Sequence, residues 1–189
     1  SACFWPKVSF GLCCNTASIS DLQACLGKTY YQLMPPGGII RSAYKELRDL
    51  DIGFYGGGFP NVPIECGIQQ LNKLLMHYGC PSSVGVQLQS SMELFLIELG
   101  RTHQPFDESF QLYQSWITSS WVKSIWEKVD HYGYKIVLNN IDFPFPRVGD
   151  KWLMRVFEDL GYDQKELRRL NRVRLHQQVL FLSDVLCVK

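Results

Sequence analysis

Several features that would assign this 189-residue chain to a common class of protein are missing from its sequence. No uninterrupted apolar run approaches the roughly 18 residues that a membrane-spanning helix needs, so we expect no membrane partner. No charged leader precedes an apolar segment with a small-residue cleavage site, so we expect no signal peptide. The seven cysteines are odd in number and include no C-x-x-C, which favours reduced, buried thiols in an intracellular protein, nuclear or cytoplasmic.

Signatures of catalysis are missing as well. Two-metal chemistry needs converging carboxylates, but the sequence has no adjacent Asp-Asp pair. Asp49 and Asp51 would point about 200° apart on a helix, so we expect both to be solvated surface residues. The glycines at 56–58 are not followed by the Lys-Ser/Thr pair of a phosphate loop, which favours a simple turn. His77 and His131 each lie two residues before a glycine, where helix C-termini are expected, and no nucleophile motif accompanies them. We therefore predict no catalytic residue in this chain.

One combination of residues has the chemistry of metal ligands. Cys66, His77 and Cys80 supply three ligand types that suit zinc, but no clear fourth ligand accompanies them. Core cysteines are the favoured interpretation, and we predict no metal or other cofactor for this chain.

The composition of the chain is that of a globular protein, and its apolar residues recur with the period of a helix. Hydrophobic residues make up 46% and charged residues 20%, enough apolar material for a sizeable core. Apolar residues recur at spacings of three and four between Gly- and Pro-rich breaks. This pattern predicts helices over about 20–34, 42–50, 64–79, 82–99, 116–133, 150–161 and 163 to at least 183.

The predicted fold is therefore mainly α, a helical bundle with at most one short extended pair or hairpin near 134–143. Ser20 and Asp150 are expected helix caps, and Asp163 with Glu166 forms a capping-box pattern at the start of the last helix. The stretch 53–63 is expected to divide an N-terminal helical unit, residues 1–52, from a second helical unit, residues 53–189, that is truncated at its C-terminal end.

Charge is concentrated near the C-terminus. Residues 163–189 hold six Lys and Arg against three Asp and Glu, although the net charge of the whole chain is only +1. At 100° per residue, four cations and a histidine fall within about one third of the circumference of the last helix. These are the predicted nucleic-acid-binding residues: Lys165, Arg168, Arg169, Arg172 and His176. Such spacing suits a phosphate backbone, but a merely solvated helix face is an equally simple explanation.

The other side of that helix carries Leu167, Leu170 and, unexpectedly, Arg174. An arginine on an apolar face is expected to be paired or to extend its charged end toward water.

Several long strings are more specific than these patterns. They occupy residues 4–13, 50–56, 72–80, 121–129, 146–154 and 170–185. Together they resemble the region after the polymerase palm in reverse-transcriptase-like proteins of non-LTR retrotransposons, as found in diatoms and other algae. The resemblance covers nearly the whole chain.

The resemblance implies thumb-like helices and a helical linker that follow the RNA–DNA template–primer. The metal-binding aspartates of the family lie in the palm, which has no counterpart in this sequence, so Mg²⁺ is expected only there. The family pattern ends at about residue 185, which implies truncation. The resemblance therefore implies that the chain is a non-catalytic fragment that helps to hold RNA or an RNA–DNA duplex. The polymerase palm and fingers would be its other partner. A helical protein-interaction or structural module, or a decayed gene remnant, is the alternative.

Overall fold

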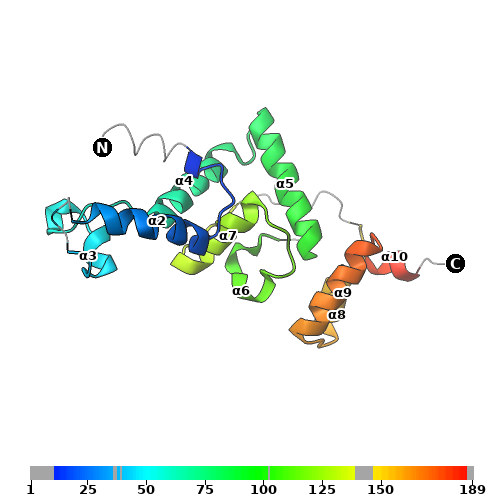
Figure 1. The fold of residues 1–189 in the computed structure, drawn as a ribbon. Helices are drawn as coiled ribbons and strands as arrows, with labels where there is room; N and C mark the ends of the chain where they lie inside the picture. The colour runs from blue at the N-terminus through cyan, green and yellow to red at the C-terminus, as the bar shows by residue number, and fades with distance from the viewer. Residues whose placement is uncertain (1–10, 36–37, 39, 102, 139–146, 187–189) are drawn as a thin grey trace. The chain divides into compact units, whose positions relative to one another are not determined.

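The computed structural model describes residues 11–35, 38, 40–101, 103–138 and 147–186 (Figure 1). These residues form helices joined by turns, and the predicted mainly α fold is confirmed. Residues 134–138 of the expected extended pair have no regular secondary structure, and residues 139–143 lie outside the described residues. An isolated antiparallel bridge occurs elsewhere, between Trp152 and Phe181.

The chain divides into two compact units, Ser1–Lys73 and Leu74–Lys189. This division differs from the boundary expected between residues 52 and 53. The reason is that the segment after Leu50 folds back on its own unit, where Gly57 N–H donates to the Leu47 carbonyl at 2.9 Å and Phe59 N–H donates to the Arg48 carbonyl at 3.2 Å. The glycine-rich stretch is therefore part of the first unit.

The first unit contains α2 (Ile19–Leu33), α3 (Lys45–Asp49), the 3-10 helix η1 (Ile52–Phe54) and most of α4 (Val62–His77). Leu12, Tyr30, Val62 and Cys66 form a buried cluster in its core. The N-cap of α2 is Ser18 rather than the expected Ser20, because the Ser18 hydroxyl accepts from Asp21 N–H at 3.1 Å and Asp21 reaches back to the Ser18 N–H.

Asp49 and Asp51 both hold local structure, and only Asp51 is exposed as the sequence predicted, whereas Asp49 is partly buried. Asp49 is paired with Arg48 and also accepts a hydrogen bond of 3.0 Å from the Asn61 amide. Asp51 accepts from Gly53 N–H at 2.7 Å and caps η1. Each carboxylate thus stabilises the backbone or side chains of its own segment.

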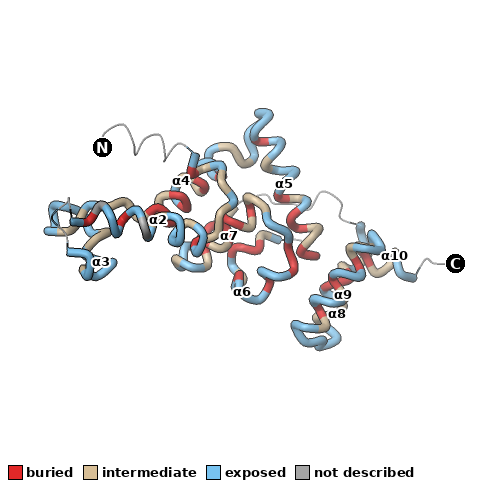
Figure 2. Tube along the Cα trace, in the orientation of Figure 1, coloured by how far each residue is buried: buried red, intermediate tan, exposed pale blue. Residues whose placement is uncertain are grey.

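The second unit has most of its buried residues in the helices of its central part: α5 (Ser83–Leu99), η2 (Pro105–Asp107), α6 (Phe110–Tyr113) and α7 (Trp121–Tyr132). Figure 2 shows buried residues along α7 and in the C-terminal half of α5. The Trp126 ring is fully buried and meets Phe95 and Phe110 edge-on, while its indole N–H donates to the Glu108 carbonyl at 2.9 Å. This geometry buries the apolar ring against other aromatic rings and gives the indole N–H a hydrogen-bond acceptor.

The helix expected to carry Trp116, Trp121 and Trp126 is interrupted. Only the last two lie on α7, which begins after Ser120 caps it by accepting from Lys123 N–H at 3.2 Å. The Lys123 ammonium donates to the carbonyls of Gln114 and Ile117 at 2.8 and 2.9 Å, so this lysine satisfies backbone groups that a continuous helix would have paired internally.

The C-terminal part contains α8 (Leu153–Asp159), α9 (Gln164–His176) and α10 (Leu182–Leu186). The α9 helix ends at His176 and does not run to Ser183 as expected. Gln178 adopts φ 56°, and Val179 N–H returns to the Arg174 carbonyl at 3.0 Å, which closes the helix end. Asp150 does not cap α8; it accepts hydrogen bonds from the hydroxyl and N–H of Ser183 instead.

The cysteine prediction is only partly right for the described residues. Cys66 is fully buried and donates to the Leu12 carbonyl at 3.2 Å, as a core cysteine should. Cys14, Cys25 and Cys80 are reduced but exposed. Within the described part of the chain, no three His, Cys, Asp or Glu side chains converge as metal ligands, and no helix combines the length and apolar character needed to cross a bilayer.

Candidate nucleic-acid interface

The candidate interface is built on α9. Asp163 caps the helix as predicted, by accepting from Glu166 N–H at 2.8 Å, which is one half of the predicted capping box, and the Glu166 carboxylate lies 3.3 Å from Arg169 Nε. Gly161, with φ +79°, allows the short turn from α8 into α9, and the two helices pack side by side (Figure 1). The direction and register of α9 are therefore set by the turn before it and by its cap.

All five predicted residues lie on the solvent side of α9. We call this set the basic face: Lys165, Arg168, Arg169, Arg172 and His176, each of which is exposed. The Arg169 side chain is 74% exposed and its Nε lies 3.3 Å from a Glu166 carboxylate oxygen one turn earlier. In the described residues, no carboxylate pairs with Lys165, Arg168 or Arg172.

Neighbouring acidic residues are engaged elsewhere. Glu158 accepts a hydrogen bond of 2.7 Å from the buried Arg101, and Asp159 lies 3.3 Å from Arg155 on its own helix. The Glu98 carboxylate accepts from the N–H and hydroxyl of Thr118. These three carboxylates, from the segment that would have supplied partners for Lys165 and Arg168 in a purely structural role, are thus directed to other groups.

The buried side of α9 explains why the basic face points outward. Leu167, Asn171 and Arg174 are almost fully buried and lie on one side of the helix, about 140° around the axis from the centre of the basic face. Burying this side leaves the cations in solvent. Sequence reasoning placed Leu167 and Arg174 on this side but did not anticipate that Asn171 would act with Arg174.

Arg174 and Asn171 together hold the last turn of α5. The Asn171 amide donates to the Glu98 carbonyl at 3.0 Å, and Arg174 Nη2 donates to the carbonyls of Ile97 and Glu98 at 2.8 and 3.1 Å. Arg174 also donates from Nε and Nη2 to the Asn171 side-chain oxygen. The last carbonyls of a helix lack internal partners and carry partial negative charge, so a guanidinium is favoured there.

Arg174 is thus paired as expected, but its partners are carbonyl and amide oxygens. No carboxylate contacts it in the described part of the chain. Burial lowers its pKa to about 10, because the charged form loses hydration that these neutral acceptors only partly replace. The group remains a cation at neutral pH.

The chain after α9 returns to α8 and secures the unit. Trp152 and Phe181 form the antiparallel bridge, and their rings lie 4.7 Å apart. The Asp184 carboxylate accepts from the N–H groups of Leu180 and Phe181 at 3.0 and 2.9 Å, and it also pairs with Arg147. These contacts hold the segment that follows His176, so both ends of the basic face are anchored.

Comparisons with known proteins leave this geometry as the main guide to function. No protein-family model, curated protein or solved structure matches the chain.

Proposed function

We propose that this chain is a non-catalytic region of a reverse-transcriptase-like protein and that it helps to hold an RNA–DNA template–primer through the basic face of α9. The observation that carries the proposal is the exposure of Lys165, Arg168 and Arg172 on one side of a helix, with no carboxylate partner among the described residues. The resemblance to the post-palm region of non-LTR retrotransposon proteins supports the same function.

The spacing of the cations fits a phosphate backbone. Lys165 and Arg172 are seven residues apart, about 10 Å along a helix axis, the length over which one strand of a duplex presents roughly three phosphates. Each cation that neutralises a phosphate releases condensed counterions, and this release depends on salt but not on base sequence. The proposed binding is therefore non-specific and salt-dependent, and the chemistry with Mg²⁺ belongs to the palm.

The proposal is tested by titrating a labelled RNA–DNA duplex with the chain at several salt concentrations and following fluorescence anisotropy. We expect binding at low salt that weakens as salt rises. Replacing Arg168, Arg169 and Arg172 together by Gln should weaken binding and reduce the log–log salt slope by about one for each phosphate that is no longer neutralised.

A control variant with the same change in net charge distinguishes duplex binding by the basic face from general electrostatic attraction between the chain and the duplex. Arg41, Lys73 and Lys135 are exposed and lie outside α9, so replacing all three by Gln removes equal charge without touching the basic face. We expect this variant to keep the wild-type salt slope. Absence of duplex binding at low salt, or equal losses in both triple variants, would contradict the proposal and favour a helical interaction or structural module.

A further inference from the structure

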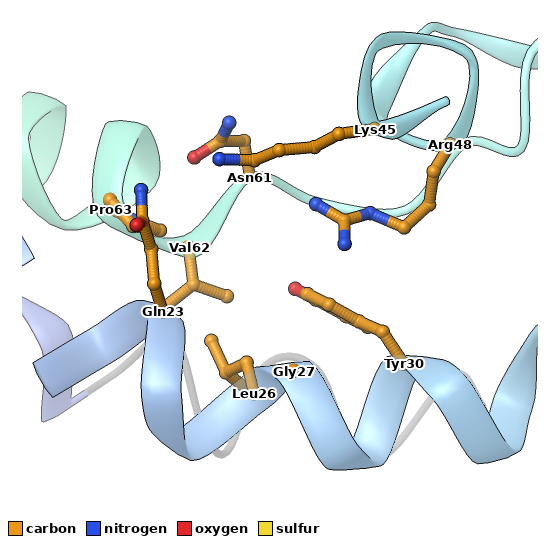
Figure 3. A pocket seen from close by; sticks show the side chains of 9 residues that line it. All are labelled: Gln23, Leu26, Gly27, Tyr30, Lys45, Arg48, Asn61, Val62 and Pro63. Carbon is orange, nitrogen blue, oxygen red and sulfur yellow. The ribbon is translucent and has the colours of Figure 1, made fainter. Parts of the chain in front are cut away.

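A pocket of about 220 Å³ opens in the first unit between α2, α3 and the start of α4 (Figure 3). Two cationic side chains enter it from α3, Lys45 and Arg48. Leu26 and Tyr30 line it from α2, and Val62 lines it from the first turn of α4. The pocket therefore combines a charged side with an apolar side, and it involves no residue of the basic face.

Arg48 is held in a fixed orientation. Its guanidinium carbon lies 4.6 Å from the centre of the Tyr30 ring, and its Nε lies 2.5 Å from the Asp49 carboxylate. Asp49 is held in turn by the Asn61 amide, and it does not line the pocket. One edge of the guanidinium is thus committed to Asp49 and one face to Tyr30.

The other edge of Arg48 faces the pocket. Figure 3 shows its terminal nitrogens directed into the space between Tyr30 and Asn61. Only 16% of the side chain is exposed, and no described residue accepts a hydrogen bond from Nη1 or Nη2. A planar guanidinium that is fixed in this way offers two parallel donors, the geometry that carboxylates and phosphates accept.

Lys45 adds a second charge on the same side. It lies one turn before Arg48 on α3, and Figure 3 shows its ammonium extending across the pocket toward Asn61. Lys45 has no ion pair with any described carboxylate. Because Asp49 offsets only one of the two cations, the pocket keeps a net positive charge.

The polar groups around the pocket do not oppose an anion. The Tyr30 hydroxyl donates to the Pro60 carbonyl at 2.6 Å, and burial raises its pKa, so the phenol stays neutral at physiological pH. The Asn61 side-chain oxygen already accepts from Ile64 N–H at 3.3 Å.

Gly27 keeps part of the pocket open. It lies in the interior of α2, where glycine is less favourable than alanine, and it lines the pocket. A Cβ atom at this position would meet nothing within 4 Å, and no positive φ requires glycine there. Neither packing nor backbone conformation requires glycine at this position, and the absence of a side chain leaves the adjoining part of the pocket open.

We propose that this pocket binds the phosphate group of a small phosphate monoester. Arg48 donates two hydrogen bonds to the phosphate oxygens, Lys45 supplies the second positive charge, and Leu26 and Val62 contact the organic part. A dianion is favoured over a carboxylate because two cations converge on the pocket and only one is offset. The proposal is independent of the function assigned to α9.

The test uses isothermal titration calorimetry on the full chain with three probes: phenyl phosphate, inorganic phosphate and acetate. We expect phenyl phosphate to bind most tightly and acetate to bind at least about tenfold more weakly, since acetate carries one charge and no ring. Inorganic phosphate that binds as tightly as phenyl phosphate would assign the pocket to the free ion and overturn the monoester. Equal affinity for all three probes would overturn the phosphate site altogether.

Substitutions connect binding to the pocket. Arg48→Gln and Lys45→Gln should each weaken phenyl phosphate binding roughly tenfold or more, and Gly27→Leu should abolish it by filling the space. Gly27→Ala should fold at least as stably as wild type while narrowing the pocket, so weaker binding by that variant cannot be attributed to unfolding. Arg41→Gln removes a cation of the same unit that does not line the pocket, and it should bind like wild type.

Among the variants, wild-type affinity in Arg48→Gln or in Gly27→Leu would also contradict the proposal. The α9 triple variant distinguishes the two proposals of function, because it should bind phenyl phosphate normally while its duplex binding is weakened. Conversely, Gly27→Leu should leave duplex binding unchanged.

Discussion

Arg174 of α9 donates a hydrogen bond of 2.8 Å from Nη2 to the carbonyl oxygen of Ile97, in the last turn of α5. This hydrogen bond fixes which side of α9 is buried and therefore which side is left for a partner. A residue that never meets nucleic acid thus positions those that are proposed to do so.

Replacing Arg174 by Ala should lower the free energy of unfolding by about 2–4 kcal/mol, because the substitution removes buried charge-assisted hydrogen bonds and leaves a cavity behind. Urea denaturation followed by circular dichroism measures this change. Arg172→Ala, on the exposed side of the same helix, should stay within about 0.5 kcal/mol of wild type. Equal stability of the two variants would show that the Arg174 hydrogen bonds are energetically unimportant.

Gly100→Ala should destabilise the second unit more than Gly133→Ala. Both glycines follow helices and have positive φ, +76° and +67°, so each substitution carries left-handed strain of about 1–2 kcal/mol. At Gly100 the new Cβ would also lie 2.5 Å from Met154 Cγ, and such overpacking costs about 1–3 kcal/mol more. At Gly133 nothing lies within 4 Å. Thermal unfolding of the two variants measures the difference. A larger loss of stability in Gly133→Ala than in Gly100→Ala would be inconsistent with the close packing of α8 on Gly100.

Glu166→Gln should strengthen duplex binding about twofold at low salt. Glu166 lies 3.3 Å from Arg169 and is the carboxylate nearest to it in the described structure, so its removal leaves that cation fully available. The effect should be small because exposed pairs are screened, and it should fade as salt rises. Anisotropy titrations at two salt concentrations provide the measurement. Unchanged or weaker binding at low salt would argue that Arg169 does not face the duplex.

Asp184→Asn should reduce the loss of stability in acid. Although burial alone raises the pKa of Asp184, the N–H groups of Phe181 and Leu180 and the guanidinium of Arg147 outweigh it, so the pKa is lowered in the folded chain. A lowered carboxylate pKa stabilises the fold above the ordinary value of 3.8, and this stabilisation is lost as pH falls through the folded pKa.

The measurement is the difference in unfolding free energy between pH 6 and pH 3, which should be smaller for Asp184→Asn than for wild type. The variant should also be less stable than wild type at pH 6, since an amide accepts the N–H groups less strongly than a carboxylate does. An identical pH dependence in both proteins would mean that Asp184 does not carry this effect.

Local patterns in the sequence predicted a large part of the helical structure. The Asp163 cap of α9 and the end of α5 before Gly100 were predicted correctly, because capping side chains and C-terminal glycines act within one turn of the chain. Two of the predictions that were wrong concern residues whose partners are distant in sequence. Asp150 pairs with Ser183 instead of capping α8, and Phe181, expected within the last helix, lies beyond the end of α9 and forms a bridge with Trp152.

The candidate phosphate pocket could not have been predicted in the same way. Its residues come from three separate helices, and neither Gly27 nor Arg48 belongs to a recognisable motif. The basic face, by contrast, lies within a single helix, so the period of 3.6 residues was enough to group its members.

The sequence by itself determined that the chain is mainly helical and that five basic residues share one side of its longest C-terminal helix, because helix period and capping depend on neighbours a few residues away. The tertiary structure alone decided that this side is exposed. Asn171 and Arg174 bury the opposite side against backbone carbonyls more than 70 residues earlier in the chain, and no local pattern encodes that arrangement.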